Sequence, residues 1–364
     1  MPHTLFQYVF ARAAKSLGIA FLVVTGIIML IDFVEANRDL GSDSDLSSLQ
    51  LFGLTLLKTP SLIEQTIPFV ILFGMMAAIS GMNRKSELIV MRASGQSAWS
   101  IIRPALVLAG IVGILWALIG NPLATRMYDA YEDFSKGDNL TNTVRFEETV
   151  WLREGRGNQQ IIIRAEEIDL PSQTLSQATF LIMAVDADGL TRFARRFDAE
   201  FAELSAQGYW QLVGVVENAP GETIQKLEGV SLPTTMDAEA LIEQTIGEKR
   251  AGFWAMPGEI RQNEAAGFSA RDLRLQFNRL LSLPIMLVAM TFIAAGVSMS
   301  LTREGGTLRL LITGAAVGFS VFFADSMVVA FGEVAILPLI VAAWSVPIIV
   351  MMLGVTYLAR IEDG

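Results

Sequence analysis

Six long apolar stretches constrain this chain more than any other feature of its sequence. They lie between charged residues at positions 15–35, 64–84, 103–126, 279–303, 309–333 and 333–360. A bilayer core about 30 Å thick requires about 20 apolar residues in a helix that rises about 1.5 Å per residue. The pattern therefore predicts six membrane-spanning helices in two groups of three, and it excludes a soluble globular enzyme.

The charged residues are concentrated between the two groups of stretches. Of the 64 charged residues, 41 lie between Arg126 and Arg279. Such a segment is too polar for a membrane, so it predicts a water-soluble domain inserted between the third and fourth spans. The predicted domains are residues 1–125 with spans one to three, 126–270 with the inserted domain, and 271–364 with spans four to six.

The insert has the pattern of a β domain. Short β-like runs, separated by glycine and proline turns, lie at residues 144–152, 160–168, 179–185, 210–216 and 223–227. This spacing predicts an antiparallel sandwich or jelly-roll. Residues 161–163 and 180–182 are core strand segments, and the sheet is either self-contained or open to strand addition by a partner. Helical stretches at 238–246 and 257–263 are predicted to lead back to span four.

Basic residues in the short loops give the orientation. With the N-terminus in the cytoplasm, the inside segments carry nine basic and four acidic residues, and the remainder of the chain is strongly acidic. The nine basic residues are Arg12, Lys15, Arg84, Lys85, Arg92, Arg103, Arg303, Arg309 and Arg360. We therefore expect both termini in the cytoplasm and the β domain outside it.

Composition excludes several other classes of protein. The net charge of −10 is unlike that of a nucleic-acid-binding protein. The absence of cysteine excludes disulfides and thiol chemistry, and His3 is the single histidine. The sequence accordingly predicts no catalytic residue, metal or cofactor in this chain.

Residues 83–95, between the second and third stretches, have the pattern of a short helix. Asn83 is an acceptable N-cap, and Gly95 suits the left-handed position after the last turn. The predicted helix combines an apolar patch with flanking charges, namely Leu88, Val90, Met91, Arg84, Glu87 and Arg92. It is either a surface helix in the lipid headgroups or a rod that fits a groove on a cytoplasmic partner, with Glu87 paired to an arginine of that partner.

The run KSELIVMRASG at residues 85–95 resembles the cytoplasmic coupling-helix motif of the LptF/LptG family, the permease subunits of the lipopolysaccharide exporter. The order of three spans, β domain and three spans is similar to that family over essentially the whole chain. The runs Gly26-Ile27-Ile28 and Phe322-Phe323-Ala324-Asp325 are more similar to LptG than to LptF.

The resemblance implies a non-catalytic permease subunit of an ABC-type exporter in the bacterial inner membrane. Its implied partners are the paralogue LptF, a dimer of the ATPase LptB, the single-span LptC, the periplasmic bridge LptA, and lipopolysaccharide. The sequence contains no G-x-x-x-x-G-K-[ST] phosphate loop, so ATP hydrolysis is assigned to another chain. The implied ATPase-coupling residues are Arg84, Glu87, Leu88, Met91, Arg92 and Gly95.

By the same resemblance, spans one and five line a lateral gate for lipid acyl chains. The apolar candidates are Ile27, Ile28, Leu30 and Ile31 on span one, and Phe319, Phe322, Phe323 and Met327 on span five. The alternative is that these are ordinary lipid-facing or helix-packing side chains.

Two acids, Asp32 and Asp325, lie about 24–26 Å along their spans and hence near the outer interface. Each is either a solvated interfacial carboxylate or part of a gate or ion pair. Arg271, Arg274 and Arg279 enter span four at this level and are candidates for pairing with these acids or for binding lipid A phosphates. Arg38 is the other phosphate candidate, because the lysines that related chains carry at the outer end of span one are missing here.

The sequence thus predicts an exporter permease, and two other classes remain open. A proton-coupled carrier would use the two acids as its relay, although such a relay belongs near the midplane. A mechanotransmitting or sensor protein would use the outer domain for signalling rather than for lipid conduction. A membrane enzyme is disfavoured because no nucleophile motif, paired midplane acids or metal ligands stand out.

Overall fold

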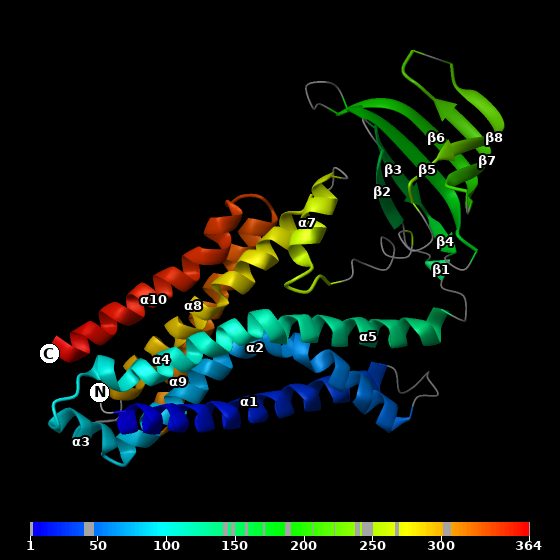
Figure 1. Cartoon of the computed structure of the whole chain (residues 1–364). Coiled ribbons are helices and arrows are strands. Elements are labelled where there is room, and N and C mark those ends of the chain that lie inside the picture. The colour runs from blue at the N-terminus through cyan, green and yellow to red at the C-terminus, as the bar shows by residue number, and fades with distance from the viewer. Residues whose placement is uncertain are drawn as a thin grey trace. The chain divides into compact units, whose positions relative to one another are not determined.

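The computed structural model divides the chain into two compact units (Figure 1). The described residues are 3–39, 47–140, 145–146, 150–156, 159–169, 172–185, 191–205, 207–221, 223–236, 241, 250–265, 269–300 and 307–363. The helical unit comprises Met1–Tyr131, Ala251–Ile260 and Ala270–Gly364. The β unit comprises Glu132–Arg250 and Arg261–Ser269.

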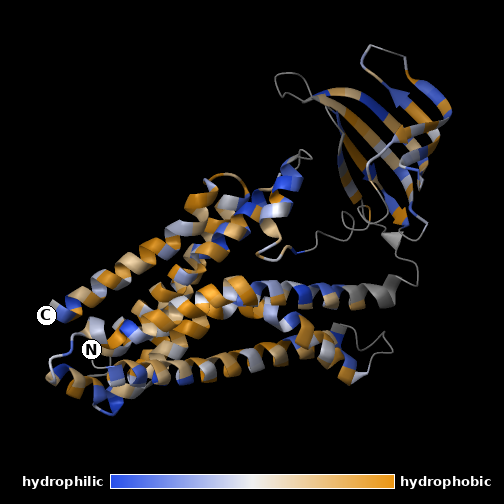
Figure 2. Cartoon of the chain, viewed as in Figure 1, coloured by the Kyte–Doolittle hydropathy of each residue, from blue (hydrophilic) through white to orange (hydrophobic). Residues whose placement is uncertain are grey.

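Helices follow the apolar stretches of the sequence. They are α1 (His3–Asp39), α2 (Ser48–Arg84), α3 (Glu87–Ala93), α4 (Ala98–Leu115), the π-helical turn η1 (Trp116–Gly120), α5 (Asn121–Leu140), α7 (Met256–Ala265), α8 (Arg271–Ser300), α9 (Thr307–Glu333) and α10 (Leu339–Asp363). Among the described residues, six helical segments are long and apolar enough to cross a membrane, which confirms the six predicted spans. Figure 2 shows apolar residues along these helices.

The second span is longer than its apolar stretch. We predicted its start at Glu64, yet α2 begins at Ser48 after an N-terminal capping box. The Ser47 hydroxyl accepts from the Gln50 amide, and the Gln50 side chain accepts from the Ser47 amide. Lys58 and Glu64 therefore lie within the helix rather than in a loop.

Helix α8 is the centre of the helical unit and packs against α2, α4, α9 and α10. Two thirds of its most apolar window is buried, compared with 11% for α1 and 17% for α9. The approach of α4 to α8 depends on Gly113, because a Cβ there would lie 2.6 Å from the Pro284 Cα. The outer helices α1 and α9 consequently leave most of their apolar side chains uncovered by this chain.

The β unit is built on one antiparallel sheet. Its strands are β1 (Arg145–Phe146), β2 (Val150–Arg156), β3 (Gln159–Ala165), β4 (Glu167–Asp169), β5 (Thr174–Val185), β6 (Thr191–Ser205), β7 (Tyr209–Asn218) and β8 (Gln225–Pro233). Strand β5 pairs with β6 on one side and with β3 and β4 on the other, and β7 and β8 continue the order after β6. The predicted all-β fold of the insert is confirmed.

Two details of the insert differ from the sequence-based expectation. Strand β6 was not predicted, and it is the longest described strand. The apolar runs of β3 and β5 are not edges, because hydrogen-bonded neighbours flank both strands. The predicted helix at 257–263 is confirmed by α7, whereas most of 238–246 lies outside the described residues.

The sheet is curved (Figure 1), and a buried carboxylate connects β2 with the segment that follows β8. Glu154 on β2 is 3% exposed and accepts a hydrogen bond from the Thr234 hydroxyl at 2.6 Å. It also accepts from the amide and the hydroxyl of Thr235, just after β8. Because the three donors satisfy this charge, the polar contact fixes β2 to the segment that follows β8.

We expect Glu154→Ala to destabilise the β unit by about 2–4 kcal/mol, because two hydroxyls and one amide lose their buried acceptor. Hydrogen exchange of the amides in β2 and β8 measures this change. Glu228→Ala, at an exposed position of β8, is the control and is expected to leave the exchange rates unchanged. Equal protection in the two variants would contradict the assigned role of Glu154.

Candidate functional site

Helix α3 lies at the end of the helical unit that holds both chain termini (Figure 1). It ends as predicted, since Gly95 has φ +83°. The Gly95 amide donates to the Arg92 carbonyl and the Gln96 amide donates to the Met91 carbonyl, which is the Schellman pattern. The predicted N-cap was wrong, because Asn83 continues α2 and its side-chain amide donates to the Ser298 carbonyl at 3.3 Å. Ser86 takes the N-cap position instead.

The two faces of α3 differ from the predicted patch. Leu88 and Met91 are 5% and 8% exposed and pack into the chain's own core. Ile89 and Val90 are 62% and 67% exposed. The expectation that Leu88, Val90 and Met91 form one exposed surface was therefore wrong: successive residues of an α-helix are about 100° apart, so Leu88 and Met91 share one face and Val90 lies on the opposite one.

The buried face of α3 belongs to a hydrophobic cluster that includes residues from five longer helices. We call these residues the anchor cluster: Val9 of α1, Ile79 of α2, Ile101 of α4, Phe292 of α8 and Leu358 of α10. All are buried. Residues of five spans therefore share one hydrophobic cluster with Leu88 and Met91 of α3.

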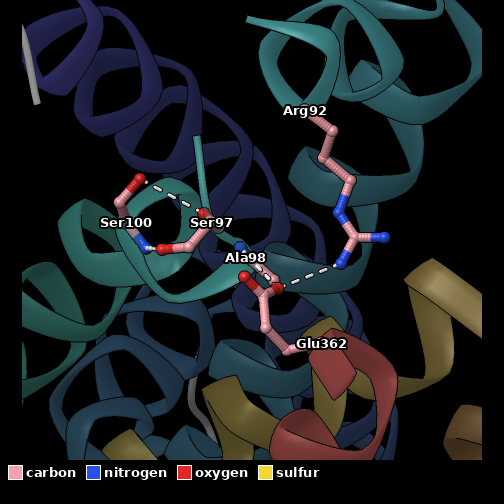
Figure 3. A network of polar contacts seen from close by, with 5 residues as sticks. All are labelled: Arg92, Ser97, Ala98, Ser100 and Glu362. Carbon is pink, nitrogen blue, oxygen red and sulfur yellow. Dashed lines mark hydrogen bonds and ion pairs between the residues drawn. The ribbon is translucent and has the colours of Figure 1, made fainter. Parts of the chain in front are cut away.

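Polar contacts hold the flanks of α3. The Tyr8 hydroxyl donates to Glu87 Oε2 at 2.9 Å. Arg92 Nη2 donates to Glu362 Oε2 at 3.1 Å, and the same oxygen accepts from the Ala98 amide at 2.9 Å (Figure 3). The two side-chain contacts, Tyr8–Glu87 and Arg92–Glu362, are exposed, so each contributes at most about 1 kcal/mol to stability.

The other two predicted coupling residues lie at the boundaries of α3. Arg84 is exposed in the last turn of α2, and Gly95 is exposed after the last turn of α3. Of the six predicted coupling residues, Leu88 and Met91 are therefore buried, Glu87 is half-buried, and the other three are exposed.

At the opposite end of α1, Asp32 forms a buried ion pair that we did not predict. Lys58 Nζ lies 2.6 Å from Asp32 Oδ1, and the side chains are 30% and 8% exposed. The Lys58 nitrogen also lies 6.0 Å from the ring centroid of Tyr131. The expectation of a pairing between Asp32 and the arginines of span four was wrong. The available sequence signal for this pair was Lys58 itself, an isolated lysine that follows the polar segment of residues 38–48.

The other predicted acid, Asp325, pairs with a predicted arginine. Arg279 Nη2 lies 3.4 Å from Asp325 Oδ2, which joins α8 to α9. Arg271 instead donates to the carbonyls of Gly332 and Leu337 at 2.7 and 2.8 Å. Arg271 thus fixes the connection between α9 and α10, since the last carbonyls of a helix have no partner within it.

The remaining charged candidates are exposed. Arg38 lies in the last turn of α1, and Arg274 lies in the first turn of α8. The Arg274 carbonyl accepts from the Asn278 side chain at 2.8 Å. Neither position brings its guanidinium together with Asp32 in a described contact.

The apolar candidates lie mainly on outward faces. Ile31 and Phe319 are each 62% exposed, and Phe322 is 39% exposed. Ile28 is partly buried against the main core. The Phe69 ring of α2 lies 5.7 Å from that of Phe319 and 5.5 Å from that of Phe322. The other four candidates are all exposed, namely Ile27, Leu30, Phe323 and Met327.

A further polar cluster surrounds Glu64, and we did not predict it from the sequence. Trp116 Nε1 and Asn121 Nδ2 donate to Glu64 Oε2 at 3.2 and 2.9 Å. Asn121 is 3% exposed and accepts from the Phe253 amide at 2.9 Å. These donors lie at the two ends of η1, so the π turn places both on the same carboxylate.

Comparison with known protein families covers nearly the whole chain. Residues 7–360 match the family model described as lipopolysaccharide export system permease LptF/LptG. The match includes all six spans and the β unit. A search of curated protein sequences found no match.

We expect the Asp32–Lys58 pair to be asymmetric in its effect on stability. Lys58→Met should lower the free energy of unfolding by about 2–3 kcal/mol, because it leaves a buried carboxylate without its cation. Asp32→Asn should cost less, since the Lys58 amine is more exposed. The double variant should be closer to the wild type than Lys58→Met alone.

Chemical unfolding in detergent measures these differences. Arg164→Met is the control, because it breaks the exposed pair with Glu166, and it should change stability by less than about 0.5 kcal/mol. Equal and additive losses for the two single variants would contradict a coupled buried pair.

Proposed function

Because the chain belongs to the LptF/LptG family of lipopolysaccharide export permeases, we propose that it is a transmembrane subunit of an ABC-type exporter. In this role it extracts lipopolysaccharide from the inner membrane and passes it to a periplasmic bridge. The observation that carries the proposal is the family match over residues 7–360, which includes all six spans and the inserted β unit. A separate ATPase supplies the energy, and this chain has no catalytic role.

The proposed assembly contains a paralogous six-span subunit, an LptB-like ATPase dimer, an LptC-like single-span protein and an LptA-like bridge. The runs at residues 26–28 and 322–325 favour the LptG type for this chain. Both termini and α3 face the cytoplasm in this arrangement, and the β unit faces the periplasm. The excess of basic residues in the short loops supports this orientation.

Helix α3 is the proposed docking element for the ATPase. Ile89 and Val90 are exposed apolar side chains suited to a groove on the partner. The Tyr8 hydroxyl holds the Glu87 carboxylate in place, so that Glu87 is oriented before it meets a partner arginine. Leu88 and Met91 anchor α3 to its own unit, which allows a force on α3 to reach the spans.

The outer faces of α1 and α9 are the proposed contact surfaces for lipid acyl chains and for the paralogous subunit. Their apolar side chains, such as Ile31 and Phe319, are more than half exposed in this chain. The proposed phosphate-binding residues are basic residues at the end of the spans that holds Asp32. They include Arg38, Arg274 and the partly exposed Lys58.

A proton-coupled carrier is the second candidate. Its relay would consist of Asp32 and Asp325, but each acid is paired with a cation, Lys58 and Arg279 respectively. These contacts indicate that the two acids form structural ion pairs between neighbouring spans rather than a proton relay. The exporter would use ATP and the carrier a proton gradient, so the energy source distinguishes the two candidates.

Purification from the native membrane in mild detergent, followed by mass spectrometry of bound proteins and lipids, tests the proposal. We expect an ATPase, a paralogous six-span subunit and lipid A to be recovered with the chain. The recovered complex, placed in proteoliposomes, should release lipopolysaccharide to an added periplasmic acceptor when ATP is supplied. Release driven by a proton gradient without ATP would support the carrier instead.

We expect Glu87→Arg to reduce ATPase co-purification and lipopolysaccharide export at least about tenfold, because the reversed charge repels a partner arginine at a buried contact. Quantitative co-purification and a proteoliposome export assay measure the two effects. Membrane insertion should be unchanged.

Glu333→Arg is the control for this prediction. It makes the same charge reversal at an exposed acid at the far end of α9. Retained co-purification and normal export in Glu87→Arg would rule out Glu87 as a docking residue.

A further inference from the structure

The last turn of α10 carries a charge that its own helix disfavours. Glu362 lies one residue before the end of α10, where the partial negative charge of the helix terminus favours a basic residue. Its carboxylate is nevertheless directed to two groups on other helices (Figure 3). A contact outside α10 therefore explains the glutamate at this position.

One oxygen of Glu362 serves both contacts. Glu362 Oε2 accepts from Arg92 of α3 at 3.1 Å and from the Ala98 amide of α4 at 2.9 Å. The Ala98 amide is one of the first donors of α4, which have no partner within that helix. Ser97 caps the same turn by accepting from the Ser100 amide at 3.1 Å. The carboxylate thus joins the end of α3, the start of α4 and the end of α10.

Helix α10 also contributes to the hydrophobic cluster that contains the buried face of α3. Leu358, one turn before Glu362, is fully buried in the anchor cluster with Leu88 and Met91. Helix α10 is therefore joined to α3 by the Arg92–Glu362 ion pair, and one turn earlier it shares a hydrophobic cluster with the buried face of α3. A displacement of α3 must either move α10 or break this ion pair.

We propose that Glu362 is a positioning residue that transmits the movement of α3 to the third and sixth spans during ATP-driven transport. This role rests on the proposed function, because it requires that an ATPase moves α3. When the ATPase displaces α3, the Arg92–Glu362 pair pulls the end of α10, and the Ala98 contact carries the start of α4 with it. Glu362 does not contact the ATPase or the lipid in this role.

The test compares variants in the intact complex in proteoliposomes, and the measured quantity is lipopolysaccharide released per ATP hydrolysed. We expect Glu362→Ala to lower this ratio at least fivefold, with normal ATPase co-purification and an unchanged thermal unfolding midpoint. Glu362→Gln keeps an acceptor oxygen but loses the charge, so it should give an intermediate ratio. Arg360→Gln, an exposed residue on the same turn, is the control and should keep the wild-type ratio.

A cleavable cross-link separates force transmission from simple stabilisation. The chain has no native cysteine, so Arg92→Cys and Glu362→Cys together provide two unique thiols within it. A bis-methanethiosulfonate linker, attached before the ATPase is added, replaces the ion pair with a covalent connection. We expect the release ratio to recover with the linker and to fall again after reduction.

The outcomes distinguish this proposal from the function on which it rests. A wild-type complex that releases no lipid with ATP would count against the proposed function. If the wild type releases lipid and Glu362→Ala keeps the same ratio, the positioning role is overturned. An equal loss in Arg360→Gln, or a linked variant that co-purifies normally with the ATPase and stays uncoupled, overturns it as well.

Discussion

The burial of α8 is the constraint on which the helical unit depends. Its backbone satisfies its own hydrogen bonds, so its position is set by side-chain packing, including the close approach of Gly113 to Pro284. Charged side chains in the surrounding helices then need partners from neighbouring spans. Asp32 is joined to Lys58 and Asp325 to Arg279, and each pair ties one outer helix to the interior of the unit.

The length of each apolar stretch was sufficient to predict the number and order of the spans. It was insufficient for their ends, because charged residues were taken as boundaries, whereas Lys58 and Glu64 lie inside α2. A charge within a helix is stable when another helix provides its partner, and a single sequence does not show which helix that is. For this reason the partner of Asp325 was among the predicted arginines, while that of Asp32 was not.

The missed strand and the misassigned face of α3 have related causes. Six of the 15 residues of strand β6 are charged. The buried residues between them, such as Phe197 and Ala199, are too few to give a clear alternation of apolar and polar residues. In α3, apolar side chains occupy both faces. Hydrophobicity alone therefore could not separate the anchoring residue Leu88 from the exposed Val90. In both segments the surrounding elements decide which residues are covered.

The π turn η1 has a consequence for how the third span tolerates change. Its extra residue rotates every later side chain by about 100° around the helix axis, compared with an uninterrupted α-helix. Helix α4 can thus face α8 while Asn121 faces Glu64. Many substitutions within this segment preserve both alignments. Deletion of a single residue would rotate all later side chains, so α4 would still face α8 while Asn121 would no longer face Glu64.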